Sequence, residues 1–205
     1  MSASATLLLA RHGQTVWHAE NRYAGVSDVA LTDEGYRQAR ELGEWAARHP
    51  VDAIWTSTVP RAIETAEPAC RALGLTPHRE RELRECDFGV VEGRTLAEFA
   101  REAPGAAAAF EEDPVGNPFP GAEDPVSAAA RGVGALRRIA EGCSGGRVLV
   151  VAHNTLIRLV LCELLGIPLR DYRRVFPRLG NTALTELRLT PTTSSLLTLN
   201  HPTTL

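Results

Sequence analysis

Short apolar runs alternate along the chain with longer segments in which apolar residues recur at helical spacing. Three of these runs lack polar alternation and are typical of strands buried on both faces: residues 6–10, 53–56 and 148–152. Two later runs, residues 183–189 and 195–200, flank Pro191 and predict a hairpin at the edge of a sheet. We therefore expect a mostly parallel central sheet with room for an antiparallel edge strand.

Four helices are predicted between these strands. Thr32 can cap the first, and Pro60 fits the first position of a second helix that Gly74 stops. Two further helical patterns cover residues 125–140 and 155–165, and the later one is apolar nearly all round. Strands that alternate with helices predict an α/β fold, here a three-layer α/β/α arrangement.

The 205 residues are enough for one sizeable core and too few for two domains with a linker. Residues 86–124 break the regular alternation, because they hold several prolines and glycines and no clear period. We interpret this segment as a small lid insertion in a single domain of residues 1–205.

Composition and charge limit the kinds of partner that the protein can bind. The chain is 44% apolar and 23% charged with a formal net charge of -3, so it has no overall basic field for binding nucleic acid. No apolar run approaches the roughly 20 residues that cross a membrane. The four cysteines form no C-x-x-C pair, and the apolar run near the N-terminus lacks the basic stretch of a secretory signal. We expect reduced thiols and a cytoplasmic protein, and the sequence leaves open whether it forms an oligomer.

A histidine follows directly after two of the buried strands. Arg11 and His12 come after the first strand, and His153 comes after the strand at residues 148–152. The carboxyl ends of parallel strands open into one crevice, so both imidazoles should meet there. The remaining buried strand leads to Arg61, in the first turn of a helix near the same edge. Two arginines and two histidines should therefore converge.

Such a cluster suits a bound phosphoryl group, because guanidinium forks match phosphate oxygens and Gly13 lets the backbone pass close to an anion. The chain lacks the Gly-rich run and lysine of a nucleotide P-loop, which argues against nucleoside triphosphate hydrolysis. The tripeptide Arg-His-Gly decides little by itself, since it arises by chance and a histidine at a strand end often has only a structural role.

A longer ordered set of motifs supports the phosphate interpretation: Arg11-His12-Gly13-Gln14-Thr15, Asp28, Leu31-Thr32, Ser57, Arg61-Ala62-Ile63-Glu64-Thr65-Ala66, Leu83-Arg84-Glu85, Gly89, Glu92-Gly93 and His153. Over nearly the whole chain, this set resembles the histidine phosphatase superfamily, which includes the cofactor-dependent phosphoglycerate mutases. The resemblance implies that His12 is the nucleophile, forming a phosphohistidine, and that Glu85 is the proton donor. It also implies that Arg11, Arg61 and His153 hold the phosphoryl oxygens, and it calls for no cofactor.

Several positions stay open. Glu85 lies in the charged run RERELRE and could also be a surface carboxylate. His18 stands where the family usually has asparagine, and it either donates to a phosphoryl oxygen or faces solvent next to Glu20. Asn154 either reaches the pocket or caps the helix after it, and we expect the cap. Tyr23 is a further candidate for lining the substrate mouth.

The first hypothesis is a phosphatase that acts on a small phosphorylated metabolite. We expect no metal site, because the histidine spacings match no zinc motif and a pocket with two arginines repels a cation. A phosphoglycerate-type mutase is the second hypothesis, although residues 86–124 are shorter than the insertion typical of those mutases. The third hypothesis is a catalytically weak protein that binds a phosphate ligand. The presence of His12, Glu85 and His153 together argues against it.

Overall fold

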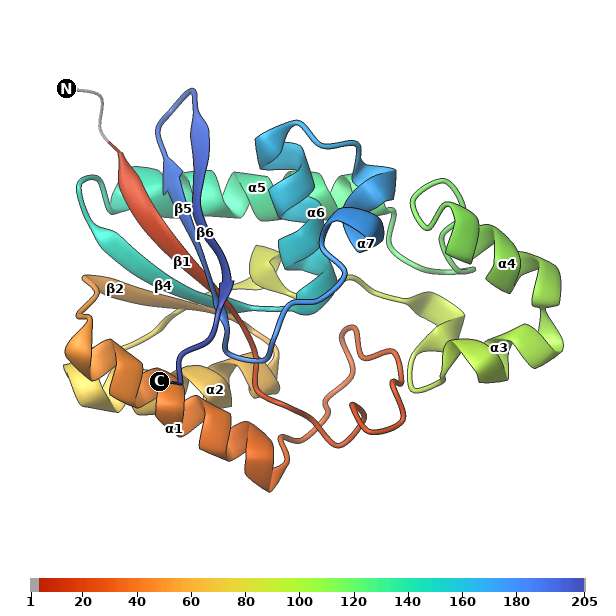
Figure 1. Ribbon diagram of the computed structural model, residues 1–205, viewed down its shortest axis with the longest axis horizontal. Helices are drawn as coiled ribbons and strands as arrows, with labels where there is room; N and C mark the ends of the chain where they lie inside the picture. Colours follow the sequence, from red (N-terminus) through yellow and green to blue (C-terminus); the bar gives the residue numbers. More distant parts are fainter. Residues whose placement is uncertain (1–3, 205) are drawn as a thin grey trace.

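A six-stranded sheet lies at the centre of the molecule (Figure 1). The computed structural model describes residues 4–204. The strands are β1 (Ala5–Arg11), β2 (Ala53–Ser57), β3 (His78–Glu80), β4 (Arg147–Ala152), β5 (Leu184–Leu189) and β6 (Ser194–His201), in the spatial order β3-β2-β4-β1-β5-β6. The first four in that order are parallel, and β5 and β6 pair antiparallel with their neighbours. The predicted mostly parallel sheet with a hairpin at its edge is confirmed.

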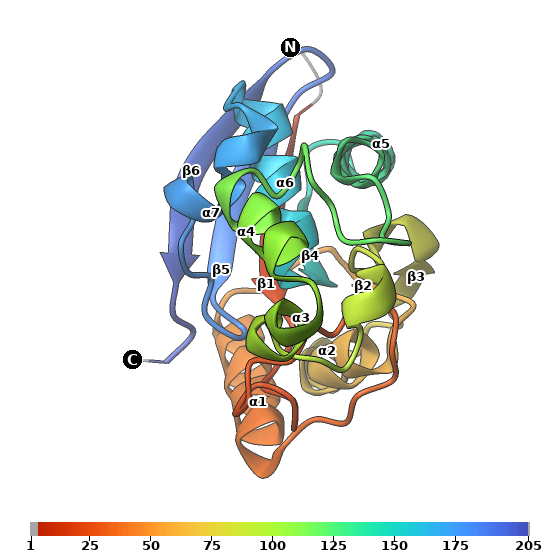
Figure 2. The same ribbon diagram turned by 90° about the vertical axis from the view of Figure 1, so that its right-hand side faces the viewer.

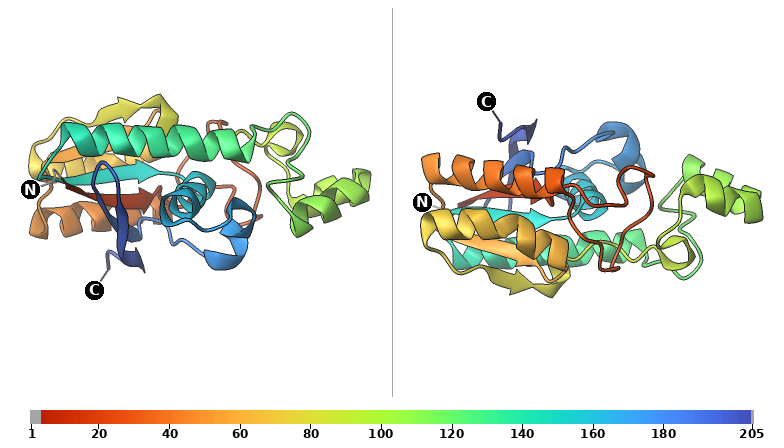
Figure 3. Two further views of the ribbon diagram at one scale, coloured as in Figure 1. Left: turned by 90° about the horizontal axis from the view of Figure 1, so that it is seen from above. Right: turned by 90° about the horizontal axis from the view of Figure 1, so that it is seen from below.

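Alternate residues of β1 enter two separate cores, one on each face of the sheet. The covering helices are α1 (Asp33–Arg48), α2 (Pro60–Leu73), α5 (Pro125–Gly142) and α6 (Asn154–Leu165). Leu7 and Leu9 pack in the core formed with α5 and α6, whereas Leu8 and Ala10 pack in the core formed with α1 and α2. Figure 3 shows the resulting three layers, with α5 on one side of the sheet and α1 and α2 on the other.

Local signals set where these helices begin and end. Thr32 Oγ1 accepts a hydrogen bond from Gly35 N at the start of α1. Pro60 is the first residue of α2, and Gly74 closes that helix in the left-handed conformation with φ of 66°. The Asp124 carboxylate caps α5. Among the helices of residues 4–204, none combines the length and the apolar composition that a membrane span requires.

Residues 86–124 project beyond the carboxyl end of the sheet, and Figure 2 shows their helices in front of it. The segment contains two short helices that its irregular sequence did not predict, α3 (Leu96–Glu102) and α4 (Pro104–Glu112). Thr95 and Glu98 begin α3 through a reciprocal capping box. Helices of seven and nine residues are too short to establish a period in the sequence. The role of residues 86–124 as a lid stays a prediction.

Other short elements also escape sequence periodicity. They are the 3-10 helices η1 (Arg81–Leu83), η2 (Gly89–Val91) and η3 (Leu169–Asp171), the single turn α7 (Tyr172–Val175), and the edge strand β3. Of these, α7 matters most for the site described below, because it closes one side of the cavity at the end of the sheet.

Candidate active site

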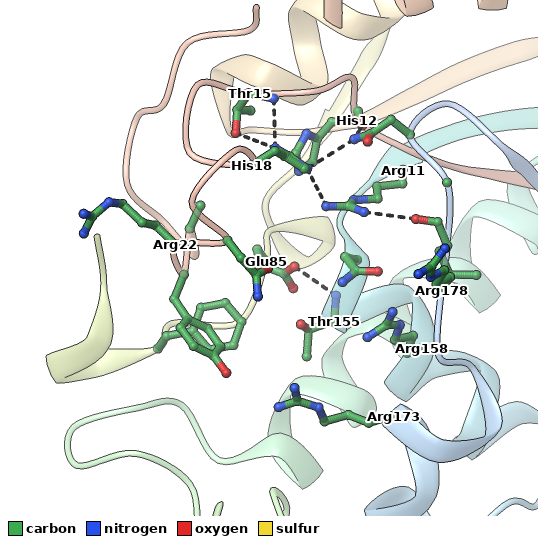
Figure 4. Close-up of a pocket in the computed structure, with 18 of the residues that line it drawn as sticks. Arg11, His12, Thr15, His18, Arg22, Glu85, Thr155, Arg158, Arg173 and Arg178 are labelled. Carbon is green, nitrogen blue, oxygen red and sulfur yellow. Dashed lines mark hydrogen bonds between the residues drawn. The ribbon is translucent and has the colours of Figure 1, made fainter. Parts of the chain in front are cut away.

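A cavity of about 480 Å³ opens at the carboxyl ends of β1 and β4 (Figure 4). Its walls come from the end of β1 and the loop after it, from Glu85, from the start of α6, and from the segment between α7 and residue 181. This is the edge of an open parallel sheet at which ligands generally bind.

The rings of His12 and His153 lie side by side, with 5.2 Å between their centroids. The strand register explains this closeness, because Arg11 of β1 pairs with Ala152 of β4 and each histidine is the next residue. The backbone N of His12 donates to the Ala152 oxygen at 3.0 Å and extends the ladder by one step. The structure therefore brings together the two histidines that the sequence placed after separate strands.

Hydrogen bonds set the tautomer of His12. Its Nδ1 lies 2.8 Å from the Gly13 carbonyl oxygen, which can only accept, so Nδ1 carries the proton. Arg61 Nε donates to Nε2 at 3.2 Å, so Nε2 presents a lone pair. Burial lowers the pKa of His12 well below its usual value, and the guanidinium groups of Arg61 and Arg11 lower it further. His12 is therefore a neutral imidazole at neutral pH, as a nitrogen nucleophile must be.

Arg61 and His153 lie behind His12 and are not among the side chains that line the cavity. Arg61 is 1% exposed and donates to three backbone carbonyls in residues 24–27 as well as to His12, which leaves one of its N–H groups uncommitted. Burial, followed by the charge of Arg61, lowers the pKa of the fully buried His153 well below its usual value. Direct contact of either side chain with a phosphoryl group stays a prediction.

Arg11 and His18 lie in the cavity wall. Arg11 Nη1 donates to the Leu179 oxygen at 3.0 Å, and Arg11 Nη2 lies 2.5 Å from His18 Nε2. His18 Nδ1 lies 2.9 Å from Thr15 N and 2.8 Å from Thr15 Oγ1. Both tautomers of the ring therefore have partners: Nδ1 accepts from Thr15 N, or it donates to Thr15 Oγ1 while Nε2 accepts from Arg11. Burial, and then the charge of Arg11, lowers the pKa of His18 to about 4. Of the two alternatives for His18, the structure has the side chain in the pocket and not in solvent beside Glu20.

Glu85 is 3% exposed, and its carboxyl group lies at the N-terminus of α6 (Figure 4). Thr155 N donates to Oε2 at 2.9 Å, and the backbone N atoms of Leu156 and Cys86 donate to Oε1 at 2.9 and 3.0 Å. Arg131 donates to the Glu85 carbonyl at 3.2 Å and so holds the backbone of this residue in place. Glu85 is not the surface carboxylate that its charged sequence run allowed, since it lines the cavity and points inward.

The prediction that Asn154 caps α6 is wrong. His153 occupies the N-cap position without a side-chain hydrogen bond, and Asn154 is the first helical residue. The Glu85 carboxylate satisfies the free N–H groups of this helix instead, from 70 residues away in the chain. Asn154 lines the cavity, as does Tyr23, which packs edge-on against Phe88 with 5.0 Å between ring centroids. Both remain candidates for substrate contact.

Sequence reasoning missed several residues of the cavity wall. Asn181 Nδ2 donates to the backbone oxygen of His12 at 2.7 Å and thereby supports the loop that carries the ring. Four further arginines line the cavity: Arg22, Arg158, Arg173 and Arg178. For Arg173 and Arg178, the signal in the sequence is the arginine-rich run at residues 170–178, which has neither strand nor helix period. Arg158 is a charged residue in an otherwise mostly apolar helix, and Arg22 lies in the loop after β1. In residues 4–204, no group of three histidine, cysteine, aspartate or glutamate side chains is arranged to hold a metal ion.

Comparisons with known proteins agree with this geometry. A family model described as histidine phosphatase superfamily (branch 1) matches residues 7–202. The probable phosphoglycerate mutase GpmB of Klebsiella pneumoniae subsp. pneumoniae is 33% identical over 179 residues, which cover 87% of this chain and 82% of that protein.

Two solved structures are also similar over nearly their whole length. Bacillus stearothermophilus YhfR has a TM-score of 0.89 at 28% identity, over 96% of this chain and 97% of its own. A mycobacterial glucosyl-3-phosphoglycerate phosphatase has a TM-score of 0.86 at 28% identity, over 97% of this chain and 99% of its own. The family match, the relative and the paired histidines at the ends of β1 and β4 lead to one conclusion: the chain belongs to the histidine phosphatase superfamily.

Proposed function

We propose that the protein is a phosphomonoester hydrolase that acts on a small phosphorylated metabolite through a phosphohistidine on His12. The observation that carries the proposal is the state of the His12 ring. It is neutral, its proton is held on Nδ1 by the Gly13 carbonyl, and the ring lines the cavity together with Arg11 and Glu85. A neutral ring with its unprotonated nitrogen available is what attack on a phosphorus atom requires. In the free site Nε2 accepts from Arg61 Nε at 3.2 Å, so the proposal requires this hydrogen bond to break when phosphorus approaches.

Arg11 and His18 supply the cationic and polar side of the proposed phosphate site. Arg11 can only donate, so in the free site His18 Nε2 accepts from Arg11 Nη2 at 2.5 Å. In the proposed complex, a phosphoryl oxygen accepts from Arg11 instead, and the other tautomer of His18, whose Nδ1 accepts from Thr15 N, donates Nε2–H to the same oxygen. The neutral Nε2–H of His18 thus replaces the amide donor that the family usually has at this position.

In the first half-reaction, His12 Nε2 forms a bond to phosphorus while the bond between phosphorus and the ester oxygen breaks. The leaving alkoxide takes a proton from the carboxylic acid of Glu85. In the second half-reaction, water attacks phosphorus, Glu85 takes the proton from that water, and the electron pair of the N–P bond returns to Nε2. Arg11 neutralises the charge on the transferred group throughout.

The similar proteins support this class of reaction and also name its main rival. The solved mycobacterial neighbour is a phosphatase, whereas the GpmB relative is named as a probable phosphoglycerate mutase. A mutase must hold its phosphoenzyme intact while the substrate turns over in the pocket. The two activities therefore differ in what happens to the phosphohistidine.

A panel of phosphate esters that includes 4-nitrophenyl phosphate and 3-phosphoglycerate tests the proposal. We expect release of inorganic phosphate without isomerised product, and an acid-labile, alkali-stable phosphoenzyme after rapid quenching. His12→Ala should abolish both, and His201→Ala, at an exposed histidine of β6, is the matched control. Isomerised 3-phosphoglycerate without net phosphate release would favour the mutase. Phosphate release that survives in His12→Ala would refute the role of His12.

We also propose that the protein works in the cytoplasm. The four cysteines are free thiols, and three of them are buried, which suits a reducing compartment. Thiol labelling of the protein directly in a denatured cell lysate tests this point, with all four thiols expected to react. Its partners under this proposal are small phosphate esters, and its acidic net charge favours neither nucleic acid nor an anionic membrane surface.

A further inference from the structure

The cavity holds more positive charge than one phosphoryl group requires. Besides Arg11, four arginines line it, and Glu85 is the one acidic side chain among its lining residues within the described chain. Arg22 is neutralised by ion pairs with Glu20 and Glu98. In residues 4–204, by contrast, no carboxylate forms an ion pair with any of the other three: Arg158, Arg173 and Arg178.

These three arginines gather on the side of the cavity formed by α6 and α7 (Figure 4). Arg158 is on α6 about one turn beyond Thr155, whose backbone N binds the Glu85 carboxylate. Arg173 is on α7 and lies over the Phe110 ring of α4, 5.2 Å from its centroid. Arg178 follows α7. In Figure 4, Arg158 and Arg173 lie farther from His12 than Glu85 does, whereas Arg178 lies beside Arg11.

Arg158 is held in place and is not a free surface side chain. Its Nη2 donates to the Pro177 oxygen at 2.9 Å, and its buried Nε has no partner within the described residues. Burial lowers the pKa of Arg158, and the nearby charge of Arg173 lowers it further. Glu85 is near Arg158 and Glu111 is near Arg173, but neither carboxylate forms an ion pair with these arginines. Guanidinium groups gathered in this way attract an anion into the space between them. Arg173 and Arg178 are exposed, so Arg158 is the fixed part of this anion site and the other two arginines can move toward a ligand.

We propose that the substrate is a phosphomonoester that carries a second anionic group, a carboxylate or another phosphate, bound by Arg158 and Arg173. The proposal rests on the proposed function, since it places the reacting phosphoryl group at His12 and Arg11. The ester oxygen then lies near Glu85, and the rest of the molecule extends along α6 toward the arginines. The cavity of about 480 Å³ admits a compact metabolite of this kind.

Matched substrates test the proposal by kinetics. The pairs are 3-phosphoglycerate with glycerol 3-phosphate and phosphoserine with phosphoethanolamine, which differ in a carboxylate. Fructose 1,6-bisphosphate with fructose 6-phosphate tests a second phosphate. For at least one pair, we expect kcat/KM to be higher for the more acidic member by roughly tenfold or more, because charged hydrogen bonds contribute at least that much. Equal values within every pair would overturn the proposal.

Variants tie this preference to the arginines. Arg158→Gln and Arg173→Gln should each lower the ratio of kcat/KM within the preferred pair by about tenfold, and the ratio cancels any loss of folded enzyme. Arg174→Gln is the matched control, because this neighbour on α7 is exposed, pairs with Asp171 and does not line the cavity. The proposal fails if the ratio is the same in the wild type and in both cavity variants.

Binding to the His12→Ala protein separates this proposal from the proposed function. Calorimetric titration with 3-phosphoglycerate and glycerol 3-phosphate measures the effect of the carboxylate without turnover, and the corresponding bisphosphate pair measures that of a phosphate. If no ester is hydrolysed by the wild type, the hydrolase assignment fails while the binding ratio still tests the second anion. If 4-nitrophenyl phosphate is hydrolysed but no pair differs in affinity or in kcat/KM, only the second-anion proposal is overturned.

Discussion

Lowering the pH should destabilise this fold through its two most deeply buried histidines. His12 and His153 are 4% and 0% exposed, and burial together with the charge of Arg61 lowers the pKa of both well below the usual value of 6.5. Below that usual value, the unfolded chain takes up protons that the folded chain does not. The free energy of unfolding therefore falls as the pH decreases through the usual histidine pKa of 6.5, and the contribution of the two histidines is complete above that pH.

The expected size follows from the number of protons taken up. Between about pH 7.5 and about pH 5.5, each histidine that stays neutral in the fold lowers the free energy of unfolding by about 1.4 kcal/mol, so the two together account for about 2.7 kcal/mol. That is a large share of the roughly 5–15 kcal/mol by which domains are usually stable. Burial is the main reason that both rings stay neutral, and the charge of Arg61 adds to it.

Urea unfolding at the two pH values measures the difference directly. The single variants His12→Gln and His153→Gln should each reduce the difference between the two pH values by about 1.4 kcal/mol, since each deletes one of the two groups. His18, whose pKa is also lowered, to about 4, keeps its own contribution in both variants. His201→Gln, at an exposed position, should leave the pH dependence of the wild type unchanged. If neither buried-site variant alters the pH dependence, the rings are not held neutral by their surroundings and the reasoning is refuted.

Three further changes probe the site and its support. Glu85→Gln should slow hydrolysis of alkyl phosphates by about 10²–10⁴-fold but that of 4-nitrophenyl phosphate far less, because only an alkoxide needs the proton; equal losses would exclude Glu85 as the acid. His18→Asn should keep most of the activity, because asparagine retains an N–H donor at this position. His18→Ala should lose roughly tenfold or more in kcat/KM, because alanine has none. Similar values for the two variants would contradict the role of His18 as a donor. Gly35→Ala should lower the midpoint of thermal unfolding, because the added Cβ would lie 2.1 Å from the Gln14 backbone oxygen. Gly105→Ala should not lower it, because no atom lies within 4 Å of the added Cβ. Equal midpoints would show that the β1–α1 loop moves to accommodate the methyl group.

The sequence was sufficient for the elements whose signal lies in neighbouring residues. The unbroken apolar runs predicted β1, β2 and β4, because a strand covered on both faces has no room for polar side chains. Thr32, Pro60 and Gly74 marked the helix ends through their own backbone preferences. The paired position of His12 and His153 also followed, because parallel neighbours bring equivalent strand ends to the same edge.

Tertiary structure decided the features that depend on residues far apart in the chain. The carboxylate that caps α6 comes from Glu85, so neither the cap nor the position of this side chain could be recognised from the helix sequence. Asn181 and the arginines of α6 and α7 meet the cavity only through packing between distant segments. Such contacts leave no period in the sequence, because the distance between two residues along the chain does not set their distance in space. The amino-acid sequence thus determined the sheet, most of its covering helices and the edge at which the histidines meet, whereas the folded chain alone determined the ionic lining of the pocket and the protonation states of its rings.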